Sequence, residues 1–191
     1  MRWFRFLPLL CAVPLLMASN CPLKLDTGES DAGVGDGGTG GDGGTGTLRD
    51  ITFAALAPGP FSQTTINGVT LTPSAYQGGQ TVTVQDTFGE GQDLMLQCAT
   101  VTVTAPELHQ SFQLVFNDDN GTILVAIYDQ SGQLLTDRAI DTRADAAAVG
   151  VVAVDQVYKK LTGAMAAGSD RRIGRMDLAS CAGGLHEIVL Q

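Results

Sequence analysis

Residues 111–128 read SFQLVFNDDNGTILVAIY, and this stretch is the strongest indication of the fold. Two runs rich in aromatic and β-branched residues flank a polar segment that ends in Asn-Gly. Such runs are typical of β-strands, and Asn-Gly is a strong signal for a reversal of the chain. The stretch therefore predicts two strands, Ser111 to Phe116 and Thr122 to Tyr128, paired as a hairpin.

Similar strand signals recur along the chain from residue 48 to residue 191. Thr64 to Ile66 and Val69 to Leu71 flank Asn67-Gly68, which predicts a hairpin with a type I′ turn, because Asn and Gly accept positive φ values. Further short alternating or apolar runs occupy residues 51–53, 81–84, 93–98, 101–104, 133–135, 173–178 and 185–190. Alternation turns one face of a strand to a core and the other to water. We therefore expect an all-β domain, built as a sandwich or a barrel.

The region near residues 155–166 departs from this pattern. Its apolar residues recur at intervals of three and four, which is the spacing of one helix face. They are Val154, Val157, Tyr158, Leu161 and Met165. A short helix here and a strand that ends near Val154 are both consistent with the sequence. Residues 143–148 (RADAAA) favour one further helical turn.

The N-terminal segment is organised as an export signal. A short positive region, with Arg2 and Arg5, precedes the apolar stretch FLPLLCAVPLLM at residues 6–17, and small and polar residues follow. This order predicts a secretory signal peptide over residues 1–20. A transmembrane helix is the alternative, but it needs about 20 predominantly apolar residues, and two prolines interrupt this shorter run.

The segment Ala18-Ser19-Asn20-Cys21 resembles the lipobox of bacterial lipoproteins. In that family the Cys is lipidated and becomes the new N-terminus, so the resemblance implies that Cys21 carries the lipid. It also implies an exported protein anchored in a membrane. Pro22 follows the Cys where an inner-membrane retention signal would have Asp, so we expect the outer membrane. Ordinary cleavage after Ala18 or Ser19 is the alternative, and it would leave a periplasmic or secreted protein.

Residues 27–47 (TGESDAGVGDGGTGGDGGTGT) form a Gly/Asp-rich segment. It contains no aromatic residue and a single large aliphatic one, Val34, so it cannot bury enough apolar surface to offset its ordering entropy. A Gly-rich chain of this length has a root-mean-square span of about 25 Å. We therefore expect residues 21–47 to be the lipid-bearing Cys and a disordered tether, and residues 48–191 to be one folded domain.

The charge of the chain limits its partners. The formal net charge is -9, and such an acidic protein does not attract nucleic acid electrostatically. We therefore expect no nucleic-acid partner. The expected partners are membrane lipid, through the acylated Cys21, and a polysaccharide or a protein of the cell envelope.

Cysteine usage fits an oxidising compartment. Cys11 leaves with the predicted signal peptide, and Cys21 is the candidate for lipidation. Cys98 and Cys181 remain, and export favours a disulfide between them. Two separate buried thiols, or a catalytic Cys, are the alternatives.

The chain has no recognisable catalytic motif. The His-Glu-x-x-His, Gly-x-Ser-x-Gly and Ser-x-x-Lys spacings are absent, and His109 and His186 are far apart in the sequence. We therefore expect no enzyme, no cofactor and no metal. Residues 117–121 (NDDNG) invite a calcium assignment, but Phe116 and Ile127 stand where an EF-hand needs Asp and Glu. A solvated turn explains them, with a structural calcium ion as the weaker alternative.

Five residues are the best candidates for ligand contacts. Arg171, Arg172 and Arg175 form a small basic cluster that suits acidic sugars or lipid headgroups, although a solvated turn also accounts for it. Tyr76 and Tyr158 are aromatic residues that can stack on sugars if they lie on an exposed face.

The layout of the domain also resembles the jelly-roll domains of secreted bacterial proteins, which include carbohydrate-binding modules and anchored surface proteins. The likeness is carried by residues 51–53 (ITF) with 66–71 (INGVTL), by 121–135 (GTILVAIYDQSGQLL), and by 173–178 with 183–190. The resemblance implies a β-sandwich that binds or scaffolds at the cell envelope. We therefore expect a non-enzymatic surface lipoprotein. A carbohydrate-binding module is the alternative, and an extracytoplasmic hydrolase is the second alternative.

Overall fold

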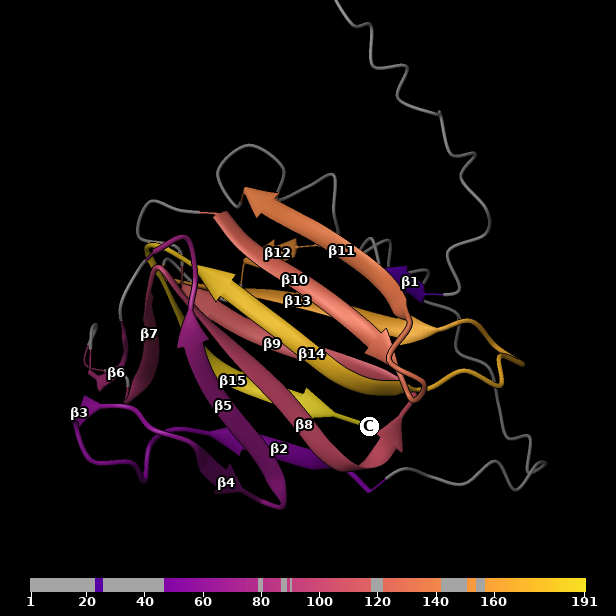
Figure 1. Cartoon of the computed structure of the whole chain (residues 1–191), viewed down its shortest axis with the longest axis horizontal. Coiled ribbons are helices and arrows are strands. Elements are labelled where there is room, and N and C mark those ends of the chain that lie inside the picture. The colour runs from indigo at the N-terminus through magenta and orange to yellow at the C-terminus, as the bar shows by residue number, and fades with distance from the viewer. Residues whose placement is uncertain are drawn as a thin grey trace, which may run out of the picture.

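The computed structural model of the chain describes residues 23–25, 47–78, 81–86, 89, 91–117, 122–141, 151–153 and 157–191. These residues form strands, turns and irregular segments, and none of them is helical. The strands make two antiparallel sheets that pack against each other, so the protein is the all-β sandwich that the sequence predicts (Figure 1). In the part of the chain that is described, no helix has the length and apolar character needed to cross a membrane.

The larger sheet, called sheet A here, has nine strands. Their order across the sheet is β1-β13-β9-β15-β7-β6-β3, and β12 and β2 pair in addition with β13 and β15. Their bounds are β1 Leu23–Leu25, β2 Arg49–Thr52, β3 Gly59–Pro60, β6 Thr81–Gln85, β7 Asp93–Gln97, β9 Ser111–Asn117, β12 Val151–Ala153, β13 Tyr158–Met165 and β15 Gly183–Leu190.

The smaller sheet, called sheet B here, has six strands in the order β11-β10-β14-β8-β5-β4. Their bounds are β4 Thr64–Ile66, β5 Val69–Ala75, β8 Ala99–His109, β10 Thr122–Asp129, β11 Leu134–Asp141 and β14 Ile173–Ser180. The chain passes from one sheet to the other several times, so residues distant in the sequence meet throughout the sandwich.

The core lies between the two sheets and follows the alternation of the strands. In β9, Phe112, Leu114 and Phe116 belong to the core, and in β7 the core residues are Leu94 and Leu96. Because successive side chains of a strand point to opposite faces, the residues between these point away from the core. This alternation defines the outer face of sheet A.

The predicted reversal at Asn67-Gly68 is confirmed. Asn67 and Gly68 join β4 to β5 with φ values of 49° and 82°, as a type I′ turn requires, and Ile66 pairs with Val69. A second hairpin joins β10 to β11 around a turn that begins at Asp129. The carboxylate of Asp129 accepts the backbone N–H groups of Ser131 and Gln133, both at 2.9 Å, and so closes this turn.

The predicted hairpin over residues 111–128 is wrong, although both of its strands exist. β9 pairs with β13 and β15 in sheet A, whereas β10 pairs with β11 and β14 in sheet B. The polar segment between them therefore joins the two sheets. A turn signal specifies a change of direction, and it does not specify whether the next strand pairs with the previous one or crosses the core.

Of the two alternatives near residues 155–166, the helix is wrong, because Tyr158 to Met165 form strand β13. The other alternative, a strand that ends near Val154, is confirmed by β12, which spans Val151–Ala153. Tyr158 and Leu161 are both buried, but they lie on opposite faces of the strand. Leu161 joins the core, and Tyr158 packs on the outer face of sheet A. Burial on both faces produced an apolar spacing that imitates a helix. Val154 lies outside the described residues.

The predicted disulfide between Cys98 and Cys181 is present. Cys98 stands between β7 of sheet A and β8 of sheet B, and Cys181 stands between β14 of sheet B and β15 of sheet A. The bridge therefore joins two places where the chain passes between the sheets.

Several predictions fall outside the described residues and stay predictions. These are the signal peptide, the lipidation of Cys21, the helical turn at 143–148 and most of the segment NDDNG at 117–121. Of the predicted tether, residues 26–46 are also outside, but Leu23–Leu25 form strand β1, which pairs with β13 at the edge of sheet A (Figure 1).

Candidate functional site on the outer face of sheet A

The register of sheet A places four residues of its outer face in one row. Tyr158 of β13 is opposite Asn117 of β9, Asn117 is opposite Gly184 of β15, and Gly184 is opposite Met95 of β7. Tyr158, Asn117 and Met95 are buried, although they do not belong to the core between the sheets. The outer face of sheet A therefore has a buried cluster of its own at this end.

Asp93 is the centre of this cluster. Its carboxylate accepts a hydrogen bond from Nδ2 of Asn117 at 3.0 Å and from the hydroxyl of Tyr158 at 3.1 Å. Nδ1 of His186 lies 2.8 Å from its other oxygen. Four strands, β7, β9, β13 and β15, contribute these side chains. The hydrogen bonds of the cluster thus link strands that are distant in the sequence.

The environment of Asp93 shifts its titration. Burial raises the pKa of the Asp93 carboxyl, because the charged form loses its contact with water, and the hydrogen bonds from His186, Tyr158 and Asn117 oppose that rise. The His186 side chain remains 29% exposed, and its ring packs at 4.3 Å from the ring of Tyr158, centroid to centroid. The carboxylate is thus internal, and the imidazole is the part of the cluster that meets solvent.

Gly184 leaves the space that the cluster needs. Its backbone N–H donates to Oδ1 of Asn117 at 2.8 Å, which turns the Asn117 amide nitrogen toward Asp93. A Cβ at position 184 would lie 2.6 Å from Sδ of Met95 and 2.7 Å from Nδ2 of Asn117. A Cβ there would force the side chain of Met95 or Asn117 to move, so the glycine preserves the geometry of the cluster.

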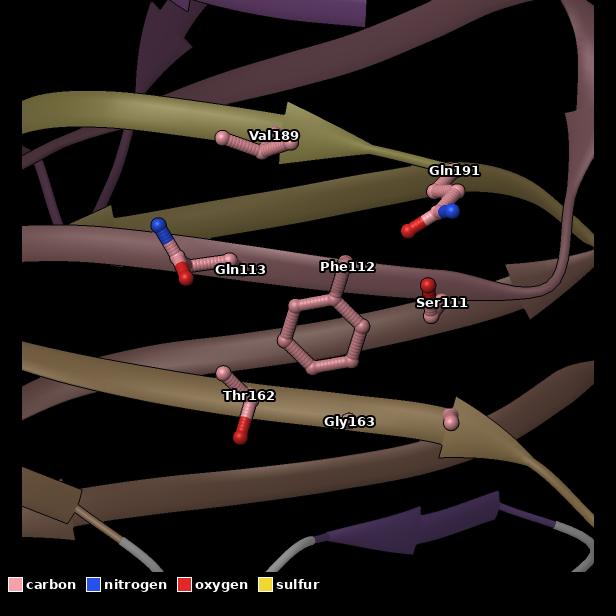
Figure 2. Close-up of a pocket in the computed structure, with 8 residues that line it drawn as sticks. Ser111, Phe112, Gln113, Thr162, Gly163, Val189 and Gln191 are labelled. Carbon is pink, nitrogen blue, oxygen red and sulfur yellow. The ribbon is translucent and has the colours of Figure 1, made fainter. Parts of the chain in front are cut away.

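A hollow of about 310 Å³ lies farther along the same face, where β9, β13 and β15 run side by side (Figure 2). Four uncharged polar side chains line it, and Val189, Gly163 and Ala164 supply apolar surface. The polar residues are Ser111, Gln113, Thr162 and Gln191. Such a lining can donate and accept hydrogen bonds without the desolvation cost of a buried charge.

Gln113 connects the hollow to the rest of the face. Its side-chain amide donates to Oε2 of Glu187 at 3.1 Å, and Glu187 is the neighbour of His186 in β15. This contact holds the Gln113 side chain in place at the wall of the hollow. The contact thus links the wall of the hollow to β15, the strand that carries His186.

The three arginines predicted to contact a ligand all bind to other groups of the protein itself. Arg171 pairs with Asp129 at 2.8 Å, and hydrogen bonds from Ser131, Gln133 and Arg171 lower the pKa of Asp129 to about 2. Nη1 of Arg172 donates to the backbone carbonyl oxygens of Ser169 and Arg171. Arg171 and Arg172 thus brace the turn between β13 and β14.

Arg175 lies apart from these two, in strand β14 of sheet B. Its guanidinium stacks over the ring of Tyr128 at 3.9 Å and forms an ion pair with Asp177 at 3.2 Å. The three arginines therefore do not converge on one ligand position.

The two predicted tyrosine contacts lie in different sheets. Tyr76 follows β5 of sheet B, where its hydroxyl accepts a hydrogen bond from Gln77 at 2.8 Å. Tyr158 lies in sheet A and is 2% exposed, because it packs against His186 and donates to Asp93. A ring that is so completely buried cannot stack on a sugar from solution, and Tyr158 is better described as part of the Asp93 cluster.

Sequence reasoning missed Asp93, Asn117 and Gly184. Asp93 is visible in the sequence only as the first residue of an alternating strand, and Asn117 only as the start of a polar turn. His186 is of a residue type that binds metal ions. In the described part of the chain, however, no group of three or more His, Cys, Asp or Glu side chains could hold a metal ion. A charged residue in the outward position of an otherwise apolar strand was the available signal.

No family model matches the chain, and no curated protein matches it. Among solved structures, the chain is similar to the enzymatically active domain of tailspike protein 4 from bacteriophage CBA120, with a TM-score of 0.30 and 17% sequence identity. The match covers 65% of this chain and 18% of that chain, so this chain spans less than a fifth of the tailspike domain. A likeness of this size carries no argument about function.

Proposed function

We propose that this protein is an exported lipoprotein, anchored through Cys21, whose β-sandwich binds a component of the cell envelope through the outer face of sheet A. The observation that carries the binding role is the hollow among Ser111, Gln113, Thr162 and Gln191, which presents hydrogen-bonding side chains from adjacent strands. The Asp93 cluster supports it, because it fixes the same four-stranded surface without occupying the hollow.

The role that we propose is non-enzymatic. In a catalytic Asp–His pair the carboxylate orients the imidazole toward a nucleophile. Here the carboxylate of Asp93 also accepts from Tyr158 and Asn117, so it links side chains of four strands, as a structural network does. The hydrolase alternative would need a reacting group beside the exposed edge of His186.

The anchor is tested by the intact mass of the protein purified from its native membranes. The proposal expects a chain that begins at Cys21 and carries acyl chains, and a Cys21→Ser variant that leaves the membrane fraction. Cys98→Ser/Cys181→Ser is the matched control, because it removes the two cysteines of the disulfide, which lie outside the predicted lipobox, and should leave the protein in the membrane fraction. A mass that begins at Ser19 or Asn20 without lipid would refute the anchor.

A carbohydrate ligand is the second candidate, and the lining of the hollow favours it. Hydroxyl and amide side chains beside a small apolar surface are the groups that hydrogen-bond to a neutral sugar ring. We expect retention on a polysaccharide panel to fall in Gln113→Ala and Thr162→Val, and to persist in Thr72→Val on sheet B. Equal retention of all three variants would exclude the hollow as the sugar site.

A further inference from the structure

We infer that strand β1, which pairs with β13 just after the proposed lipid-bearing Cys21, holds the sandwich against the membrane. The inference rests on the proposed lipid at Cys21. It adds an orientation to that proposal: the end of the sandwich that carries the turn between β13 and β14 faces the bilayer.

The first observation is the pairing of β1. Leu23, Lys24 and Leu25 pair with Met165, Ala164 and Gly163 of β13, in antiparallel register. Because the strands run in opposite directions, the chain that precedes Leu23 continues past Met165, toward the turn at residues 166–172. The N-terminal end of β1 therefore lies at the end of β13 from which that turn begins.

The second observation is the short distance to the proposed anchor. Cys21 lies two residues before Leu23, and consecutive Cα atoms are about 3.8 Å apart, so the Cα atom of Cys21 lies within about 8 Å of that of Leu23. In the sequence, Pro22 alone separates the proposed lipid-bearing residue from the paired strand. A lipid at Cys21 would thus bring the edge of β13 to the membrane surface.

The third observation is that the Gly/Asp-rich segment begins and ends on one row of sheet A. Leu25 pairs with Gly163, Gly163 with Phe112, Phe112 with Leu190, and Leu190 with Arg49. Four spacings between neighbouring strands amount to about 19 Å.

This distance suits the length of the segment. The 23 residues between Leu25 and Arg49 form a Gly-rich chain, whose root-mean-square span at this length is about 25–29 Å. The chain can therefore close a loop over about 19 Å without being stretched. Both ends of the segment can stay on the sandwich, and the segment then adds no distance between the domain and the lipid.

In the proposed orientation, two exposed alanines, Ala167 and Ala75, lie at different distances from the membrane. Ala167 lies in the turn just after Met165, and the backbone N–H of Met165 donates to the carbonyl of Gln110, next to the end of β8. Ala75 pairs with Ala99 at the opposite end of β8. In the paired strand β14, the partners of Ala99 and His109 are Ser180 and Ile173, seven residue steps apart, which is about 23 Å. Ala167 should therefore lie near the bilayer and Ala75 far from it.

The same orientation places the hollow near the membrane. Gly163 and Ala164 line the hollow and are also the residues with which β1 pairs. A ligand of the hollow must then reach the sandwich close to the bilayer surface.

The test uses the chain from Cys21 to Gln191 and single Trp reporters. The only Trp of the sequence is Trp3, in the predicted signal peptide, so Ala167→Trp and Ala75→Trp each give a protein with one Trp. With the Cys98–Cys181 disulfide intact, Cys21 is the single free thiol, and it can be coupled to a maleimide phospholipid in phosphatidylcholine vesicles. Nitroxide headgroups in the vesicles then quench a nearby Trp.

We expect quenching of the Ala167→Trp protein to exceed that of the Ala75→Trp protein by at least about twofold, because the two positions are more than about 20 Å apart along the sandwich. A Lys24→Pro/Leu25→Pro variant should abolish the difference, because proline removes the N–H groups of β1. Lys24→Ala is the matched control and should keep it. Equal quenching at the two positions, or a difference that survives the proline variant, would overturn the inference.

The chemical coupling keeps this test separate from the proposed lipidation. If the native protein carries no lipid but the coupled protein shows the orientation, the anchor proposal fails and the role of β1 stands. If the native protein is lipidated but the two reporters are quenched equally, the anchor stands and the role of β1 fails. Hydrogen exchange of the uncoupled protein adds a second readout, in which protected amides in residues 23–25 are expected and unprotected ones would contradict the pairing.

Discussion

Nδ1 of His186 lies 2.8 Å from Oδ1 of Asp93, although the two residues are 93 positions apart in the chain. The contact joins β15 to β7, two neighbouring strands of sheet A. Asp93 is fully buried on the face that turns away from the core, and a buried carboxylate is tolerated only when hydrogen-bond donors surround it. The pair therefore belongs to a network in which each member depends on the others.

Asp93→Asn should destabilise the protein by about 1–3 kcal/mol, because a charged acceptor shared by three donors is lost. Asn117 cannot turn its amide to compensate, since its carbonyl already accepts the N–H of Gly184. Tyr158→Phe removes a single donor and should cost about 0.5–1.5 kcal/mol. Urea denaturation at pH 7 measures both changes.

Asp177→Asn is the control for this substitution. Asp177 also accepts from a hydroxyl and an arginine, Thr102 and Arg175, but it lies on sheet B and is half-buried. A partly exposed pair of this kind contributes about 0–1 kcal/mol. If Asp93→Asn proved no more costly than Asp177→Asn, the Asp93 network would not stabilise the fold.

Gly184→Ala should destabilise the protein strongly, because the new Cβ would lie 2.6 Å from Sδ of Met95 and 2.7 Å from Nδ2 of Asn117. Overpacking of this kind costs about 1–3 kcal/mol. Gly183→Ala is the graded comparison, since its nearest contacts would be 3.1 Å and 3.2 Å, to Ser180 and Asn117. Thermal unfolding should rank the two variants in that order, and the reverse order would contradict the geometry of the cluster.

His109 should make the protein sensitive to mild acid. It is fully buried, and neither ring nitrogen has a hydrogen-bond partner among the described residues. Burial lowers the pKa of His109 below its ordinary 6.5, so between that value and the folded-state pKa the unfolded chain binds the extra proton. The free energy of unfolding should therefore decrease as the pH falls below 6.5.

His109→Leu tests this sensitivity. The variant should lose the part of the pH dependence that lies just below pH 6.5, and it should gain about 1–3 kcal/mol at pH 7, because an unsatisfied polar group leaves the interior. Urea titrations between pH 7 and pH 5 measure both effects. His186→Asn is the control and should keep the acid sensitivity that His109 causes. An unchanged pH profile in His109→Leu would show that His109 is not responsible.

The strands could be predicted from the sequence, but most of their pairing could not; the short hairpin of β4 and β5 is the exception. Runs such as DLMLQ in β7 carry their own period of two, so local residues determine that a strand forms. The partners of β9 and β10 depend on which faces are buried in the finished sandwich. Both faces of β9 carry buried residues, Leu114 on one and Val115 on the other, and no local pattern reveals the strands that cover them.

The same reason explains why the Asp93 cluster was not predicted. Asp93, Asn117, Tyr158 and His186 are spread over most of the domain, and none belongs to a motif with fixed spacing. Only the register of sheet A brings them together. The disulfide could be predicted because only two cysteines follow the candidate anchor, so the pairing needed no knowledge of the fold.

Loss of the Cys98–Cys181 bridge should destabilise the sandwich by about 2–5 kcal/mol, because the bridge closes a long loop and so restricts the unfolded chain. The two residues are 83 positions apart, and they stand where the chain passes between the sheets. Urea unfolding of a Cys98→Ala/Cys181→Ala variant, compared with wild type, measures the loss. Cys21→Ser is the control and should leave the free energy of unfolding unchanged. A double variant as stable as the wild type would mean that the packing of the two sheets alone fixes these crossings.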